Sequence, residues 1–116
     1  MIDRQIITHM QNNRRLSERI PTRLKVQHGI SGANFTGHTL NISSNGLAIQ
    51  SPIIFPTNRR ICIDLYIGHE ATKLDGIVVW SIWDKNTFNS RMGIKLSQNI
   101  DKLIRTKFSI VPKLKK

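Results

Sequence analysis

The chain has 116 residues, of which 18 are lysine or arginine and 7 are aspartate or glutamate, so its formal net charge at pH 7 is +11. This length suits a single domain, a hydrophobic content of 39% excludes an intrinsically disordered chain, and no apolar stretch is long enough for a membrane helix. A single cysteine, Cys62, excludes an internal disulfide and, with a start that lacks the pattern of a signal peptide, predicts a cytoplasmic protein.

Hydrophobic periodicity predicts a short helix and then three strands in the first half of the chain. Apolar residues recur at helical spacing within residues 1–12, and a polar loop is expected over 14–18. The period then changes to two over residues 23–30, which predicts a half-buried strand. Two further strands are expected over 35–42 and 47–50, separated by turns rich in Ser, Gly and Asn.

The second half predicts three more strands and a helix. Alternation is clearest over residues 61–67, and strands are also expected over 74–83 and 91–96. Apolar residues then recur at i, i+3, i+4 and i+8 from Ile100 to Phe108, which predicts a helix capped by Asn99 or Ser97.

Six short strands at this spacing predict a closed, six-stranded antiparallel β-barrel, because closure removes exposed strand edges. The complete expectation is a mainly β domain with a C-terminal α-helix and a short N-terminal helix. We expect residues 1–12 to form an N-terminal helical extension, 13–111 the domain itself, and 112–116 a basic C-terminal tail.

The residues that could carry catalysis do not converge in the sequence. The carboxylates are scattered, and although Asp64 and Asp75 could face each other across a hairpin, such pairs are more often surface features. Cys62 is expected to be a buried, inert thiol on a strand. The four histidines show no metal-ligand spacing. The sequence therefore predicts a protein that is not an enzyme and that holds neither a metal nor a cofactor.

Two tryptophans raise the question of base stacking, as on barrels that bind single-stranded nucleic acid. Trp80 ends a strongly apolar run, 76–80, and Trp83 follows it closely. We interpret this run as core, and exposed stacking rings as the alternative.

The positive charge lies at the two ends of the chain. Residues 1–25 hold six bases and two acids, a net of +4, and residues 102–116 hold six bases and no acid, a net of +6. The middle, 26–101, has six bases and five acids, a net of +1. A nearly neutral body with basic ends indicates a polyanionic partner, such as nucleic acid, nucleotide phosphates or an anionic membrane surface.

Three arginines precede the first full strand. Arg15 and Arg19 form an R-x-x-x-R pattern, and Arg14 stands directly before it. Guanidinium groups bind phosphate oxygens in a forked geometry, pair with O6 and N7 of guanine, and stack on purine rings. Two of them four residues apart could hold one phosphorylated purine, and a solvated charge run is the alternative.

A second polar motif lies between two expected strands, at residues 41–46. Asn41 and Ser43 are two apart, so on an extended segment both side chains point to the same face. An amide and a hydroxyl side by side can bind a guanine edge or a phosphate. Gly46 is expected to supply the positive φ that the turn needs. An ordinary polar hairpin turn is the alternative.

Together, Arg15-x-x-x-Arg19 and Asn41-x-Ser43-x-x-Gly46 resemble the paired signature of PilZ domains, R-x-x-x-R and [D/N]-x-S-x-x-G. Residues 76–80 and 91–96 are similar to two of the family's strands, and the likeness covers about residues 13–110.

The resemblance implies a six-stranded barrel that binds the bacterial second messenger cyclic di-GMP. Arg15 and Arg19 would hold guanine and phosphate, assisted by Arg14. In a second contact, Asn41 and Ser43 would bind guanine, and Gly46 would keep the turn close to the ligand. Asn41 replaces the commoner aspartate, and Asn45 replaces a frequent second glycine. Any output would pass to a partner protein through ordering of the arginine loop, without membrane insertion.

Two other hypotheses remain. A small basic barrel could bind RNA or single-stranded DNA, although the expected scarcity of exposed aromatic rings disfavours nucleic acid. A degenerate PilZ fold could act as a protein-interaction module without nucleotide, although such members usually lack the arginines that this chain has.

Overall fold

The computed structural model describes residues 19–108. The expected N-terminal helix within 1–12, the loop at 14–18 with Arg14 and Arg15, and the tail at 112–116 lie outside the described residues.

Seven strands and one helix follow one another along this part of the chain. The elements are β1 (Ile20–Pro21), β2 (Lys25–Gly29), β3 (Phe35–Ser43), β4 (Gly46–Ser51), β5 (Arg60–Ile67), β6 (Glu70–Asp84), β7 (Asn89–Leu96) and α2 (Asp101–Phe108). Six of these strands match the predicted ones. The seventh, β1, is a two-residue addition at the edge of β3.

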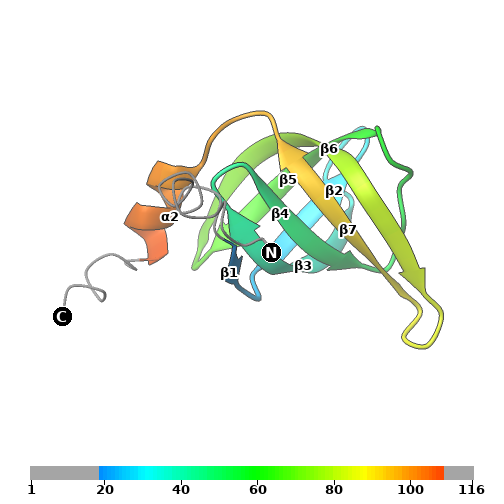
Figure 1. Cartoon of the computed structure of the whole chain (residues 1–116). Coiled ribbons are helices and arrows are strands. Elements are labelled where there is room, and N and C mark those ends of the chain that lie inside the picture. The colour runs from blue at the N-terminus through cyan, green and yellow to red at the C-terminus, as the bar shows by residue number, and fades with distance from the viewer. Residues whose placement is uncertain (1–18, 109–116) are drawn as a thin grey trace, which may run out of the picture.

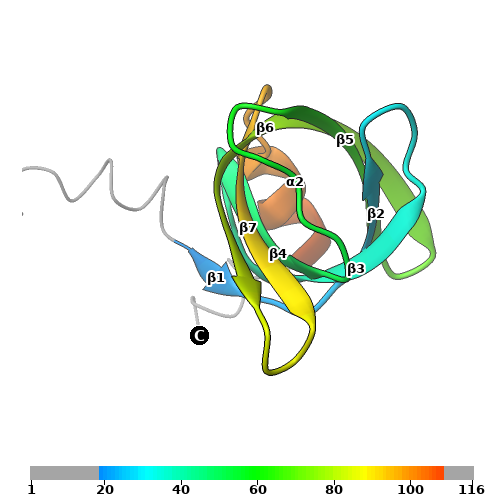
Figure 2. The same cartoon turned by 90° about the vertical axis from the view of Figure 1, so that its right-hand side faces the viewer.

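The strands form one antiparallel sheet that closes on itself. Their order is β1-β3-β2-β5-β6-β7-β4, and an additional pairing of β3 with β4 completes the ring. The first residues of β3 pair with β2 and the last ones with β4, so β3 joins the two ends of the sheet. Figure 2 looks along this barrel and shows the strands surrounding its interior. The predicted six-stranded antiparallel barrel is confirmed.

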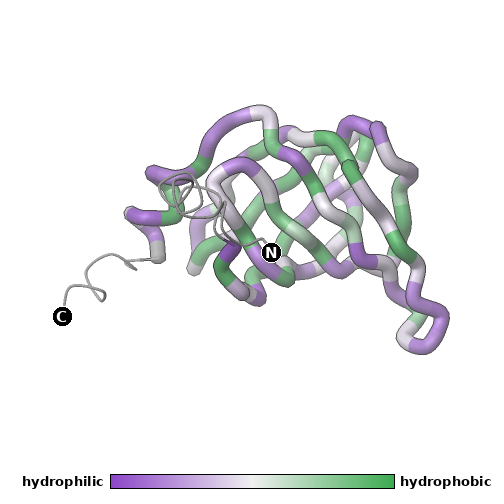
Figure 3. Tube along the Cα trace, in the orientation of Figure 1, coloured by the Kyte–Doolittle hydropathy of each residue, from purple (hydrophilic) through white to green (hydrophobic). Residues whose placement is uncertain are grey.

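The core consists of the inward-facing residue of each pleat. The hydrophobic residues that are 1% exposed or less are Val26, Ile42, Leu47, Ile49, Ile61, Ile63, Leu65, Val78, Met92 and Ile94. Each such burial stabilises the fold by about 1.5–3 kcal/mol relative to an exposed side chain. Apolar and polar residues alternate along the strands in Figure 3, as a sheet with one face in a core requires.

The two ends of the barrel differ. At one end, Ile104 of α2 and the preceding Ile100 pack onto the core, and their exposed fractions are 6% and 4%. At the other end, the β6–β7 hairpin extends past the neighbouring strands (Figure 1). The predicted cap is confirmed, because Asn99 Oδ1 accepts a hydrogen bond of 2.8 Å from the backbone N–H of Asp101.

Three expectations about single residues are wrong. Trp80 and Trp83 are 40% and 44% exposed, so neither belongs to the core. Asp64 and Asp75 do not face each other, because β5 and β6 pair in a register that sets Asp64 opposite Lys73. The expected burial of Cys62 is only partial: it is half-buried, and its Sγ donates to the Gly29 carbonyl at 3.3 Å.

Within residues 19–108, no helix is both long and apolar enough to cross a membrane. The same range contains no group of three or more His, Cys, Asp or Glu side chains placed to hold a metal ion.

Candidate functional site

The short strand β1 places Arg19 on the outside of the barrel. It pairs Ile20 with Ile42 and Pro21 with Asn41, and Arg19 directly precedes it. From there the Arg19 Nη1 donates a hydrogen bond of 2.7 Å to Asn41 Oδ1. The structure thus joins one residue of the arginine motif to the first residue of the second motif, 22 positions later in the chain.

Asn41 and Ser43 share the outer face of β3, as predicted. Ile42 between them is fully buried and pairs with Leu47, which is also inside the barrel. The Ser43 residue is nevertheless only 4% exposed, and its hydroxyl donates to the Gly46 carbonyl at 3.2 Å. In this arrangement the serine closes the turn of its own motif, and its remaining hydrogen-bonding capacity is that of an acceptor.

Gly46 is required for a different reason than the expected one. Neither Gly46 nor Asn45 is among the described residues with positive φ. Instead, a Cβ at Gly46 would stand 2.7 Å from the Ile94 carbonyl oxygen and 3.7 Å from Arg19 Nη2. The glycine therefore allows β4 to approach β7 closely and allows the arginine side chain to lie over the strand.

Two neighbouring rows of paired residues cross the outer face of the barrel at this site. The first row runs from Asn41 across Ala48 and Gly93 to Trp80, and the second runs from Ser43 across Gly46 and Lys95 to Ile77. Paired residues of antiparallel strands point to the same face, so each row lies on one surface.

We define the outer platform as the six residues Asn41, Gly46, Ala48, Trp80, Gly93 and Lys95. Its middle consists of residues with little or no side chain, Gly46, Ala48 and Gly93. Asn41 and Trp80 stand at its two ends, three strand spacings or about 14 Å apart. The three small residues are themselves buried, so the accessible groups of the platform are the side chains of Asn41, Trp80 and Lys95.

Trp80 is the platform residue that sequence reasoning assigned wrongly. A Cβ at Gly93 would stand 2.0 Å from Trp80 Nε1 and 2.5 Å from Cε2, so the indole lies directly over this glycine. The ladder shifts register between Val78 and Trp80, which indicates a bulge at Val79. The bulge turns the tryptophan outward, and a continuous apolar run in the sequence gives no signal of where such a bulge occurs.

The platform is electropositive. The exposed side chains Arg19 and Lys95 lie on or beside it, and neither takes part in an ion pair among residues 19–108. At its margin, Arg23 Nη1 lies 2.7 Å from His38 Nε2, and because arginine can only donate, this nitrogen accepts. Burial, followed by the charge of Arg23, lowers the pKa of His38, so this margin carries the charge of the arginine.

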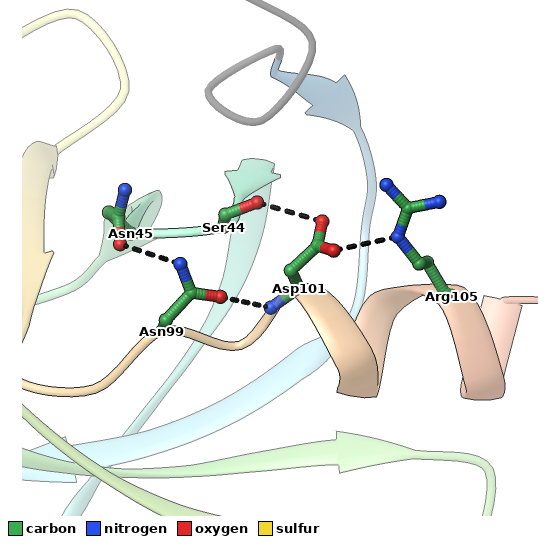
Figure 4. A network of polar contacts seen from close by, with 5 residues as sticks. All are labelled: Ser44, Asn45, Asn99, Asp101 and Arg105. Carbon is green, nitrogen blue, oxygen red and sulfur yellow. Dashed lines mark hydrogen bonds and ion pairs between the residues drawn. The ribbon is translucent and has the colours of Figure 1, made fainter. Parts of the chain in front are cut away.

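The turn between the motif residues is tied to the C-terminal helix (Figure 4). Ser44 Oγ donates to Asp101 Oδ1 at 3.0 Å, and Asn99 Nδ2 donates to Asn45 Oδ1 at 3.3 Å. The Arg105 Nε completes this network at 2.7 Å from Asp101 Oδ2. The backbone N–H of Ile100 also donates to the Ser44 carbonyl, at 2.7 Å. These hydrogen bonds couple the turn to α2, so a displacement of the turn would also displace the start of the helix.

Of the six predicted site residues, the structure brings Arg19, Asn41 and Gly46 into direct proximity and sets Ser43 beside them. Arg14 and Arg15 lie outside the described residues. Sequence reasoning missed Lys95 and Trp80, and only the pairing of β7 with β4 and β6 reveals them.

The fold and the site define a small closed barrel whose outer face joins two polar motifs. The chain belongs to the PilZ domain family, whose model matches residues 13–108. Members of this family are generally receptors for cyclic di-GMP.

Among solved structures, the chain is similar to the Inhibitor of motility (MotI/DgrA) of Bacillus subtilis, with a TM-score of 0.64 and 19% sequence identity. The likeness covers 89% of this chain and 53% of that one, so the chain spans about half of the other protein's length. No curated protein matches the chain.

Proposed function

We propose that this protein is a non-catalytic receptor that binds cyclic di-GMP on the outer platform. The observation that carries the proposal is the contact of Arg19 with Asn41 above Gly46, because it joins the two motifs of the family signature at one place. Membership of the PilZ family supports the choice of ligand.

Arg19 and the platform together offer contacts to the phosphates, the base edge and the base plane of a guanine nucleotide. The guanidinium of Arg19 can bind a phosphate in a forked geometry or pair with guanine O6 and N7. The amide of Asn41 offers a donor and an acceptor to the base edge, without the charge-assisted bond of an aspartate. The indole of Trp80 offers a stacking surface, and the ammonium of Lys95 attracts the phosphates.

The remaining arginines of the signature, Arg14 and Arg15, precede this site in the chain. In our proposal they add contacts to the nucleotide once it lies on the platform, and this orders the arginine loop. The ordered loop then forms a new surface for a downstream partner protein. The ties from Ser44 and Asn45 to the start of α2 offer a second route by which ligand contacts reach the rest of the molecule.

Calorimetric titration of the full chain with cyclic di-GMP tests the proposal. We expect binding with a defined stoichiometry, and we expect Arg19→Ala to weaken it by about 1–3 kcal/mol, the value of a bidentate base contact. Lys73→Ala is the control, because Lys73 is also an exposed cation but lies opposite Asp64 near the other end of β6, seven residues before Trp80. No heat of binding at high micromolar nucleotide would refute the proposal, as would equal losses in the two variants.

A further inference from the structure

The second half of β6 has a free edge. On one side, residues Trp80–Asp84 pair with β7, and β7 in turn is covered by β4 as far as Ser90. On the other side, the pairing of β6 with β5 ends at Ile77, followed only by two backbone hydrogen bonds between Val78 and the loop at Asn58 and Arg59. Beyond Val78, no strand among residues 19–108 pairs with this edge. Unpaired N–H and C=O groups along such an edge form a template for another strand.

The exposed apolar side chains of the described chain gather on this hairpin. Five of the seven large ones lie within ten residues of the sequence, and they are 40–74% exposed: Val79, Trp80, Ile82, Trp83 and Phe88. A cluster of this kind beside an open strand edge is typical of an interaction surface.

The two ends of the edge carry opposite charges. Asp84 closes it at the hairpin turn, and Arg60 stands at the other end, on the first residue of β5. Neither forms an ion pair within the described part of the chain. An edge with an acid at one end and a base at the other is complementary to an antiparallel copy of itself.

We propose that this free edge is a dimerisation surface, on which β6 of a second copy of this chain adds antiparallel to β6 of the first. A two-fold axis near Ile82 makes the contact self-complementary, as closed dimers require. The incoming strand takes the place that β5 would occupy if it began several residues earlier, so the two barrels share one continuous sheet.

The alternation of side chains sets the register. Trp80, Ile82 and Asp84 share the outer face, because they pair with Gly93, Arg91 and Asn89 of β7. Keeping both outer faces on one side sets Ile82 opposite its own copy and Asp84 opposite Trp80 of the second chain. Arg60 then lies three positions further along the same face, about 10 Å from Asp84 of the second chain along the strand. The long side chain of arginine can span this separation, so each dimer contains two such ion pairs.

Sedimentation equilibrium of the full chain without nucleotide tests this proposal, over concentrations from about 1 to 200 µM, which suit a micromolar dissociation constant. We expect the apparent mass to rise from the 13.3 kDa of one chain towards twice that value. Ile82→Lys places a charge on the two-fold axis at a half-exposed position, and should raise the dissociation constant at least roughly tenfold.

Charge reversal distinguishes this surface from any other contact. Arg60→Asp and Asp84→Arg should each weaken the dimer, and the double variant should restore it, because each chain then presents the reversed pair. Lys73→Asp, an exposed change near the other end of β6, is the control and should leave the mass unchanged.

A monomer at every concentration overturns the proposal and leaves the edge to a strand of a different protein. A dimer that is indifferent to Ile82→Lys and to both reversals also overturns it, since another surface must then join the copies. Because no nucleotide is present, neither result bears on the proposed binding of cyclic di-GMP.

Discussion

Trp80 and Gly93 depend on each other for their positions on the outer platform. A methyl group at Gly93 would stand 2.0 Å from Trp80 Nε1, so Gly93→Ala must displace the indole from the barrel surface. In a Trp83→Phe background, we expect the fluorescence emission of Trp80 to shift to longer wavelength. Loss of the stacking surface should weaken cyclic di-GMP binding by about 1–3 kcal/mol.

A double-mutant cycle checks that the effect passes through the tryptophan. Once Trp80→Leu has removed the ring, adding Gly93→Ala should cost little further affinity. Fully additive losses would contradict the role of Trp80 in the site.

His28 gives the barrel a dependence on pH. The residue is fully buried, its Nε2 lies 2.7 Å from Ser51 Oγ, and its ring lies 6.3 Å from those of Phe35 and Phe55. Burial lowers the pKa of His28 from 6.5 to about 4. Between these values the unfolded chain binds a proton that the folded chain does not. The free energy of unfolding therefore decreases as the pH is lowered from about 6.5 to about 4, by about 3 kcal/mol in all.

Urea unfolding between pH 7 and pH 4 measures this effect. The carboxylates of the protein titrate at the lower end of the same range, so the comparison is with His28→Gln, which has no proton to gain. The variant should start less stable at pH 7, because it loses a packed ring, and should then lose less free energy of unfolding on acidification. Parallel curves for the two proteins would contradict this assignment.

At the scale of elements, the start of α2 is held by Asp101. Its carboxylate accepts hydrogen bonds from Arg105 in its own helix and from Ser44 in the motif turn, and both lower its pKa, Arg105 most strongly. An acid in the first helical turn also interacts favourably with the helix dipole. Asp101→Ala should therefore destabilise the protein by about 1 kcal/mol and release α2 from the turn.

Hydrogen exchange resolves where this release occurs. We expect faster exchange in the first turn of α2 and in the motif turn, with the strands of the barrel unchanged. Lys102→Ala, at the exposed neighbouring position, is the control. Equal exchange in Asp101→Ala and the native protein would show that the network does not couple the two segments.

Most elements of the fold could be predicted because each has a strong local signal. Strands such as β5 alternate apolar and polar residues without interruption, and α2 repeats its apolar residues at helical spacing. The barrel followed from the number of short strands and from the need to remove edges. Element ends were harder to predict: the strand expected over residues 74–83 begins four residues earlier, at Glu70.

The candidate site was predictable only as far as its motifs reach. Asn41 and Ser43 share a face because alternation is a local property. The burial of Ser43, the reason for Gly46 and the outward turn of Trp80 each depend on a neighbouring strand or on a bulge. Interactions between strands that are distant in sequence leave no periodic signal in either strand, so only the folded structure reveals them.

At the scale of the whole molecule, the exposed tryptophans remove one argument against nucleic acid. Their expected burial disfavoured RNA or single-stranded DNA as the partner, yet Trp80 and Trp83 are both available for stacking. The net charge of +11 also suits a polyanion. However, Arg19, Asn41 and Gly46 meet within one small area, which suits a single small ligand better than a long nucleic-acid strand.

Thermal unfolding of the full chain separates the two partners. Cyclic di-GMP at a hundred times its dissociation constant should stabilise the folded state by about 2.7 kcal/mol, which corresponds to roughly 10–20 °C for a domain of this size. A dianion that contacts few cations loses little of this effect as salt rises. A single-stranded oligonucleotide of arbitrary sequence, at equal phosphate concentration, should give a much smaller shift that disappears at about 200 mM salt. The opposite pattern would identify the barrel as a nucleic-acid binder.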